Sequence, residues 1–145
     1  MRPTDRLRRV AGRFVGTWQE STVTGDGERL EGTLTSTFEA DGSALVQRFS
    51  SPDGTFTFVS LAHVDDESER WQETYVFSDG RSARYEWDEL ADEVVIRRLG
   101  GDPADLRRLR IRHVNDDLYE VTEDRSTDRG RTWESVELTR TRRVA

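Results

Sequence analysis

Hydrophobic and polar residues alternate along most of this chain, in short runs of similar length. In the run 83–87, for example, Ala83, Tyr85 and Trp87 alternate with polar residues. A period of two places alternate side chains on opposite faces of a β-strand, one face buried and the other in water. The same rhythm is found in the runs 34–38, 45–49, 71–77, 109–113 and 119–121. The pattern therefore predicts a protein built from sheets.

Turn signals separate these runs at regular intervals. Nine clusters rich in Gly, Asp and Asn lie at 25–27, 41–42, 53–54, 65–66, 79–80, 91–92, 100–103, 115–117 and 128–130. Asp-Gly and Asn-Asp pairs supply the positive φ angles that tight hairpins need. The pair Asp102-Pro103 also suits the start of a helix, but we interpret it as a turn that leads into a strand.

Nine turns imply about ten strands, each joined to the next by a short hairpin. An open sheet of that size would twist until its first and last strands meet. We therefore predict an all-β, up-and-down meander barrel formed by one domain, residues 1–145. A two-sheet sandwich is the alternative, but it needs longer crossovers than the sequence contains.

Two segments depart from simple alternation. Residues 4–11 carry Leu7, Val10 and Ala11 at helical spacing, which predicts a short amphipathic helix that plugs one end of the barrel. In residues 55–64 both faces of the strand are apolar. We expect the outer face of that strand to be covered, either by the N-terminal helix or by a partner subunit in a homodimer.

Composition narrows the kind of protein. Cysteine is absent, which excludes disulfides, thiolate nucleophiles and cysteine zinc sites. A net charge of -7, from 22 basic and 29 acidic residues, argues against nucleic-acid binding. The arginine-rich start lacks the apolar run of a signal peptide, and no segment has the roughly 20 apolar residues of a membrane helix. We expect a soluble, cytoplasmic protein with neither nucleic acid nor membrane as a partner.

Residues 14–18 read Phe-Val-Gly-Thr-Trp, which resembles the Gly-x-Trp signature on the first strand of lipocalins and their calycin relatives. The final hairpin, 128–133, resembles that of uncharacterised bacterial lipocalin-like proteins, and the likeness spans nearly the whole chain. It implies a lipocalin- or fatty-acid-binding-like barrel of about ten strands with a short N-terminal helix. It also implies that Trp18 closes the lower end, with Arg140 or Arg142 stacked on its indole, a contact of roughly 0.5–2 kcal/mol.

Departures from known relatives bear on the ligand. The haem-binding nitrobindins need a proximal His and a longer glycine-rich start, neither of which can be placed in this chain, so we predict no cofactor. Fatty-acid-binding proteins hold a carboxylate with interior Arg and Tyr residues. Arg98 and Tyr119 are the candidates for that role here.

Glu73 is the main candidate for acid or base chemistry. It shares a strand face with Trp71 and Tyr75, so an inward orientation would place a carboxyl group in an apolar wall and raise its pKa. His113 and Tyr75 are the other catalytic candidates. A structural role is the simpler interpretation of Glu73, and a packed core position is the simpler interpretation of His113.

Aromatic residues on adjacent strands indicate where a ligand would bind. Trp71, Tyr75, Tyr85 and Trp87 are expected to form one wall that suits a flat or hydrophobic molecule, although such a wall also suits an ordinary core. The ligand-binding candidates are Trp71, Tyr85, Trp87, Phe49, Arg98 and Tyr119.

Arginines cluster at 97–98 and 107–112. They suggest an anion site, but we favour solvated outer-face residues paired with the abundant acids. The two histidines, His63 and His113, show no spacing that brings them together, so no metal site is predicted. No nucleophile elbow or phosphate-binding loop is present.

Two functions remain open at the level of sequence. The first is a non-catalytic barrel that holds a small hydrophobic or amphipathic molecule against the aromatic wall. The second is a cyclase, isomerase or lyase that acts on a small hydrophobic substrate inside the barrel with one acid or base. A barrel filled by its own side chains and acting through a partner is a third, structural interpretation.

Overall fold

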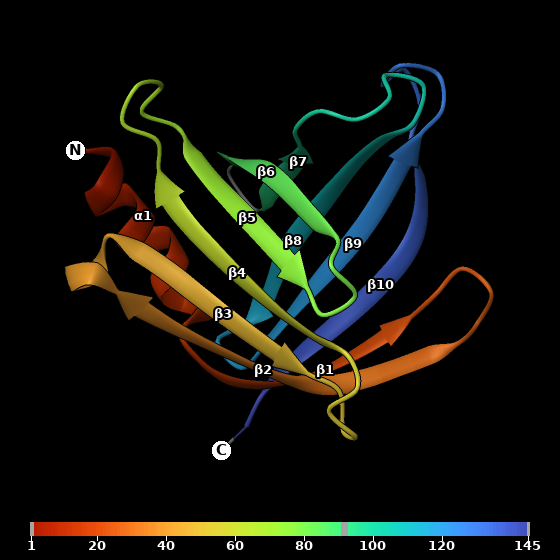
Figure 1. The fold of residues 1–145 in the computed structure, drawn as a ribbon, viewed down its shortest axis with the longest axis horizontal. Helices are drawn as coiled ribbons and strands as arrows, with labels where there is room; N and C mark the ends of the chain where they lie inside the picture. The colour runs from red at the N-terminus through yellow and green to blue at the C-terminus, as the bar shows by residue number, and fades with distance from the viewer. Residues whose placement is uncertain (1, 91–92, 145) are drawn as a thin grey trace.

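The computed structural model describes residues 2–90 and 93–144, which form a closed antiparallel barrel (Figure 1). The strands are β1 Gly16–Val23, β2 Arg29–Glu39, β3 Ala44–Ser50, β4 Thr57–Val64, β5 Trp71–Phe77, β6 Ser82–Glu89, β7 Val94–Arg98, β8 Leu106–Asn115, β9 Leu118–Ser126 and β10 Glu134–Arg143. Each strand pairs with its neighbours in sequence, and β1 pairs with β10 to close the sheet. The predicted ten-strand meander is therefore confirmed. The turn predicted at 91–92 lies outside the described residues.

Short helical segments precede the first strand and interrupt one hairpin. Helix α1, Pro3–Ala11, continues into the 3-10 turn η1, Gly12–Phe14, and a second 3-10 turn, η2, spans Ala40–Gly42. The Asp102-Pro103 pair forms a turn before β8, as predicted.

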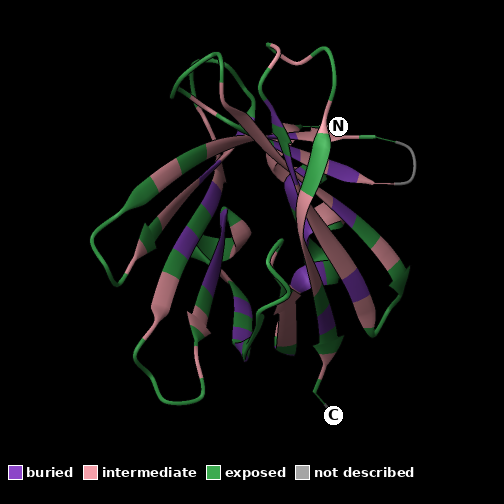
Figure 2. Cartoon of the chain, turned by 90° about the vertical axis from the view of Figure 1, so that its right-hand side faces the viewer, coloured by how far each residue is buried: buried purple, intermediate pink, exposed green. Residues whose placement is uncertain are grey.

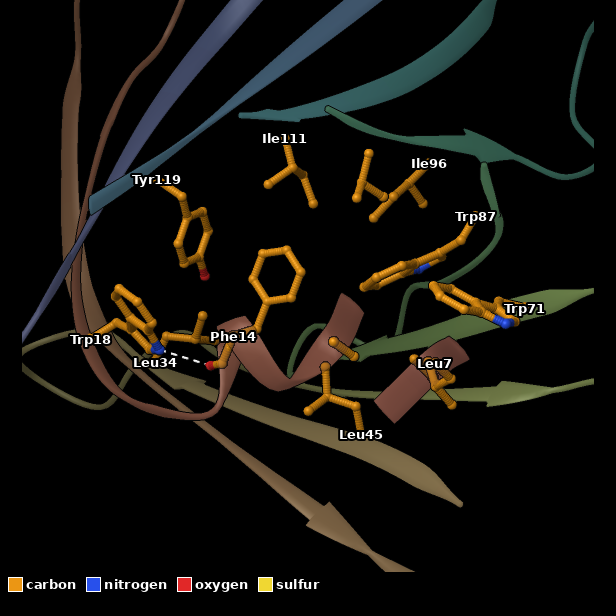
Figure 3. Packing of buried hydrophobic residues seen from close by; sticks show 13 residues of the cluster. Leu7, Phe14, Trp18, Leu34, Leu45, Trp71, Trp87, Ile96, Ile111 and Tyr119 are labelled. Atoms are coloured by element: carbon orange, nitrogen blue, oxygen red, sulfur yellow. Dashed lines mark hydrogen bonds between the residues drawn. The ribbon is translucent and has the colours of Figure 1, made fainter. Parts of the chain in front are cut away.

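Helix α1 plugs one end of the barrel. Its apolar face inserts Leu7 and Ala11, both fully buried, and η1 adds Phe14 (Figure 3). Polar contacts fix the helix to the barrel rim: Arg8 Nη2 donates to the carbonyl of Asp41 at 2.8 Å, and the Trp71 indole donates to the carbonyl of Pro3 at 3.1 Å. The predicted plug is confirmed.

Trp18 forms the floor of the barrel beside this plug. Its indole N–H donates to the carbonyl of Phe14 at 2.8 Å (Figure 3). The arginine stacked on its ring is Arg143, 4.1 Å from the ring centre, so the expectation of Arg140 or Arg142 was wrong. The register pairs Trp18 with Arg143, and alternation puts the even-numbered residues of β10 on the other face of the sheet.

The surroundings of Gly16 explain why the Gly-x-Trp segment begins with a glycine. Its φ is +136°, and a Cβ atom there would lie 2.5 Å from Nη1 of Arg143. The guanidinium uses this space to donate to the carbonyl of Val15 at 2.9 Å. A side chain at Gly16 would therefore strain the backbone and displace the arginine that stacks on Trp18.

The outer face of β4 is not covered by the helix. Val59 and Leu61 are 39% and 41% exposed, and Val76 on the adjacent β5 is 54% exposed. Helix α1 packs inside the barrel end instead, where the apolar inner faces of the strands converge. The expectation that this helix covers the outer face was wrong, whereas cover by a partner subunit stays a prediction.

Along the strands, buried and exposed residues alternate in the way that the sequence pattern predicts (Figure 2).

Among the described residues, no helix has the length and apolar composition needed to cross a bilayer.

Candidate functional site

A cavity of about 1140 Å³ fills the barrel between the plug and the opposite, open end. All ten strands contribute lining residues, and Phe14 of the plug reaches it from below. A space of this size exceeds what most drug-sized ligands need. The plug end is packed, whereas the rest of the interior is not.

One side of the cavity is an aromatic wall formed by β3 to β6. Phe49 stacks on Phe58 at 5.2 Å between ring centres, Phe58 contacts Tyr75 at 5.4 Å, and Tyr75 contacts Tyr85 at 5.4 Å. Phe77 continues the wall toward the open end at 5.8 Å from Phe58. These rings present a continuous apolar surface on which a flat molecule can lie.

The structure divides the four residues of the wall predicted from the sequence. Tyr75, Tyr85 and Trp87 line the cavity. Trp71 does not, although it pairs with Trp87 in register and lies 5.8 Å from its ring, because its indole is bound to the plug helix. Phe49 was predicted separately, and Phe58, which joins it to Tyr75, was not singled out.

Glu73 lies at the base of the cavity, 1% exposed. The Trp87 indole donates to its Oε1 at 2.9 Å, and Ser60 Oγ lies 2.7 Å from its Oε2. Burial raises the pKa of Glu73, although these hydrogen bonds oppose the change. The predicted inward orientation is therefore what the structure shows.

A chain of hydrogen bonds connects Glu73 to β2. Ser60 Oγ donates to Oε2 of Glu73 and also lies 3.4 Å from Oε1 of Gln47. The Gln47 amide in turn donates to Ser36 at 2.9 Å. These contacts satisfy the buried polar groups around the carboxyl group and fix its orientation.

Tyr119 and His113 belong to the plug end. Tyr119 packs edge-on against Phe14 at 5.1 Å and Trp18 at 4.9 Å, though it also borders the cavity. His113 packs on Phe14 at 4.9 Å, and it is not among the cavity-lining residues. Burial and the nearby Arg13 lower the pKa of His113 to about 4, so the ring is neutral near pH 7.

The three tyrosines at the cavity are neutral as well. Burial raises the pKa of Tyr75, Tyr85 and Tyr119 above the ordinary value for a phenol. Of the three catalytic candidates, the structure thus brings Glu73 and Tyr75 to the cavity and leaves His113 in the packed plug.

Three further carboxylates line the cavity on the side formed by β1, β9 and β10. Burial raises the pKa of Glu20 to about 7. Glu123 and Glu137 face each other across β9 and β10, and burial together with this contact raises the pKa of Glu137 to about 7. The cavity is therefore amphipathic, with rings on one side and acids on the other.

These three acids were not predicted from the sequence, although a signal for Glu20 was available. Glu20 lies two residues beyond Trp18 on the same strand, and alternation gives both residues the same face. Glu123 and Glu137 carry no comparable marker, because their meeting depends on the β9–β10 register and on an irregularity between Ser135 and Glu137.

The arginine clusters divide between the two faces of the sheet. On the outer face, Arg108 and Arg110 both bind the buried Asp124, at 2.8 and 2.6 Å, and Arg112 binds Glu120 at 2.7 Å. These pairs agree with the interpretation of the cluster as outer-face ion pairs.

Arg97 also forms outer-face ion pairs, 2.6 Å from Asp88 and 3.0 Å from Glu86. The remaining two arginines, Arg98 and Arg107, line the cavity toward its open end. Arg107 contacts Asp105 at 3.2 Å and Glu123 at 3.6 Å. Arg98 forms no ion pair within the described part of the chain. It is the last residue of β7, whereas Tyr119 lies at the plug, so the structure does not bring Arg98 and Tyr119 together as one carboxylate clamp.

No cluster of three or more potential metal-binding side chains is found among the residues 2–90 and 93–144. The polar side chains that line the cavity carry carboxyl, hydroxyl, phenol, amide, indole and guanidinium groups.

Solved structures with the same fold support the architecture. A protein of unknown function from the DUF3598 family of Nostoc punctiforme has a TM-score of 0.55 and 18% identity, over 92% of this chain and 48% of the other. An S-type phycobiliprotein lyase from Guillardia theta has a TM-score of 0.54 and 14% identity, over 96% and 93%. A de novo designed fluorescence-activating β-barrel has a TM-score of 0.50 and 20% identity, over 93% and 97%.

The comparison bears on the fold alone at these identities. This chain spans about half the length of the DUF3598 protein and nearly the whole of the other two. No family model matches the chain, and no curated protein does either. The shared fold is therefore that of a closed β-barrel, and the resemblance to lipocalin-like proteins stays a prediction.

Proposed function

We propose that this barrel is a lipocalin-like binding protein that holds a small amphipathic molecule with a flat apolar part inside its cavity. The observation that carries the proposal is the cavity of about 1140 Å³, bounded on one side by the ring contacts that run from Phe49 to Tyr85. A barrel evolved for stability alone would fill this space with side chains, as it does at the plug.

Similarity to other barrels agrees with this proposal. A closed barrel of this fold occurs both in a designed fluorescence-activating protein and in a phycobiliprotein lyase, which are proteins of different function. The proposal itself rests on the cavity of this chain, because a shared fold does not fix function.

A neutral fluorogenic probe tests the proposal. N-phenyl-1-naphthylamine should bind saturably with about one site per chain and gain fluorescence when it leaves water. The variant Leu109→Trp places a large ring in the cavity and should weaken binding by about ten-fold. The control Val76→Trp adds the same ring to the exposed outer face of β5 and should leave binding unchanged.

Two results would overturn the proposal. One is the absence of saturable binding by the unmodified protein. The other is binding that Leu109→Trp leaves intact or that Val76→Trp weakens to the same extent, because the probe would then lie outside the cavity.

A second candidate function is catalysis, which the position of Glu73 favours. A carboxyl group with a raised pKa at the base of an apolar cavity can act as a general acid or base, and Tyr75 beside it is a neutral hydrogen-bond donor. Cyclisation, isomerisation or elimination on a small hydrophobic substrate needs no cofactor beyond such an acid.

This second candidate is tested on molecules that the protein retains from an extract. Mass spectrometry should show that a retained molecule is converted to an isomer or an elimination product by the wild-type protein but not by Glu73→Gln. Conversion at the same rate by both proteins would remove Glu73 from the reaction. Retention without any conversion would leave binding as the function.

A further inference from the structure

The deep end of the cavity carries carboxyl groups. Glu20 and Glu73 each lie two residues from a tryptophan of the plug end, Trp18 and Trp71, and so lie close above it. The arginines that line the cavity lie toward the open end together with further acids; the arginines are Arg29, Arg81, Arg98 and Arg107. A molecule that reaches the base of the cavity therefore meets carboxyl groups there without a neighbouring arginine.

Glu20 is the deep acid that has no counter-charge. Within the described ranges it has neither an ion pair nor a side-chain hydrogen bond, and it lines the cavity. Glu73, by contrast, is committed to Ser60 and Trp87. A carboxylate without a partner in a largely apolar interior carries a desolvation penalty. A ligand that places a positive charge or N–H donors beside it removes part of that penalty and so gains binding free energy.

The aromatic wall reaches this carboxylate. Glu20 pairs in register with Gly32 of β2, and a Cβ atom on Gly32 would lie 2.2 Å from the ring of Phe49. The Phe49 ring therefore occupies the space above Gly32, between β1 and β3. A ring face and a carboxylate that adjoin in this way suit an aromatic cation or amine, because both elements attract positive charge.

The opposite ligand polarity fits the cavity poorly. A fatty-acid-like molecule with its carboxylate inward would face Glu20, and with its carboxylate at Arg98 it would lay its tail on Glu20 and Glu73. The mouth does not favour anions strongly either, because Arg107 is already paired with Asp105 and Glu123.

We propose that the ligand of this cavity is a flat aromatic molecule that carries an ammonium or N–H-rich group at its inner end, held by Glu20. This inference rests on the proposed binding function and adds the chemical class of the ligand. It assigns Glu20 as the residue that selects by charge, while the wall from Phe49 to Tyr85 selects by shape.

Three probes with one ring system and different charges test the inference. These are 1-naphthylmethylamine, 1-naphthalenemethanol and 1-naphthylacetate, titrated by calorimetry at about pH 8, where a carboxyl group with a pKa of about 7 is ionised and the amine keeps its proton. The ammonium compound should bind about ten-fold more tightly than the alcohol, and the acetate more weakly than either.

Substitutions then locate the source of the preference. Glu20→Gln should reduce binding of the ammonium compound to the level of the alcohol and leave the alcohol itself unchanged. Glu134→Gln, at an exposed position that does not line the cavity, should change neither. Thermal melting of both variants checks that they fold.

The outcomes separate this inference from the function beneath it. Equal binding of all three naphthyl compounds, or tighter binding of the acetate, overturns the ligand class but leaves a binding cavity. An ammonium preference that survives Glu20→Gln overturns the role of Glu20. Absence of binding by all three compounds and by N-phenyl-1-naphthylamine overturns both the inference and the proposed function.

Discussion

The two ends of the barrel are made from the same strands but differ in what fills them. At the plug end, Phe14, Trp18 and Tyr119 pack edge to face, and Arg143 seals the floor. Toward the open end, the same inward positions carry rings on one side and unfilled space beside carboxylates. Stability is thus concentrated at one end, which leaves the other free to hold a ligand.

Removal of Trp18 should have the largest effect on this arrangement. Trp18→Ala deletes a fully buried indole together with its hydrogen bond to Phe14 and its stack with Arg143. We expect a loss of about 3–5 kcal/mol in the free energy of unfolding, measured by denaturant titration. The control Trp133→Ala removes a partly exposed indole that contacts Arg108 and should cost about 1 kcal/mol. Similar losses in the two variants would contradict a stability centre at the plug.

One substitution made at both ends compares them directly. Leu45→Ala at the plug removes a fully buried side chain and should cost about 2–4 kcal/mol, whereas Leu109→Ala at the cavity should cost about 1 kcal/mol. The difference arises because Leu109 borders the cavity and therefore has fewer packing contacts to lose. Equal losses by denaturant titration would show that Leu109 is packed as tightly as Leu45 and that the cavity is not open.

Glu20→Gln should have a smaller effect than the loss of Trp18 or Leu45, and it should stabilise the protein. Burial raises the pKa of Glu20 from 4.5 to about 7 in the folded protein. As the pH rises from about 4.5 to about 7, the unfolded chain ionises first, so this residue costs the folded state stability over that range. The variant should therefore be more stable by about 1–2 kcal/mol at about pH 8 and equal to wild type below about pH 4.

Neighbouring groups leave this pH signal readable. Tyr75 and Tyr119 have raised pKa values and stay neutral over the range in which Glu20 titrates, and Glu73, whose pKa is also raised, is present in both proteins. Glu137 titrates in the same range in both proteins, so it cancels in the difference between them. A gain in stability that does not depend on pH would show that the carboxylate of Glu20 is not desolvated.

The sequence predicts the fold well because alternation and turn spacing are local signals. The ten strands, the plug helix and the inward face of Glu73 all follow from residues within one strand or one turn. The stacking partner of Trp18 could be predicted only from the β1–β10 register, which no local pattern specifies. The predicted arginines, Arg140 and Arg142, were therefore wrong. The expectation that the N-terminal helix covers Val59 and Leu61 was wrong for a similar reason, since the side of the sheet on which a helix packs is a long-range property.

The candidate site shows the same division between local and long-range information. The sequence located Tyr75, Tyr85, Trp87 and Glu73 at the cavity, because they share a face on two adjacent strands. It did not separate Trp71 from them, since the hydrogen bond between its indole and Pro3 of the plug helix joins residues far apart in the chain. The pairing of Glu123 with Glu137 also depends on register. The ligand class inferred from Glu20 depends on the positions of all the charged and aromatic side chains that line the cavity.

The four tryptophan indoles test the division between plug and cavity most directly. In a ¹H–¹⁵N spectrum they give separate N–H signals, which single Trp→Phe variants assign. Trp18, Trp71 and Trp87 report the floor, the plug helix and the cavity base, and Trp133 reports the outer contact with Arg108. Titration with N-phenyl-1-naphthylamine should shift the Trp87 signal and leave the other three in place. A shift of Trp133 or Trp71 with Trp87 unmoved would contradict ligand binding inside the barrel.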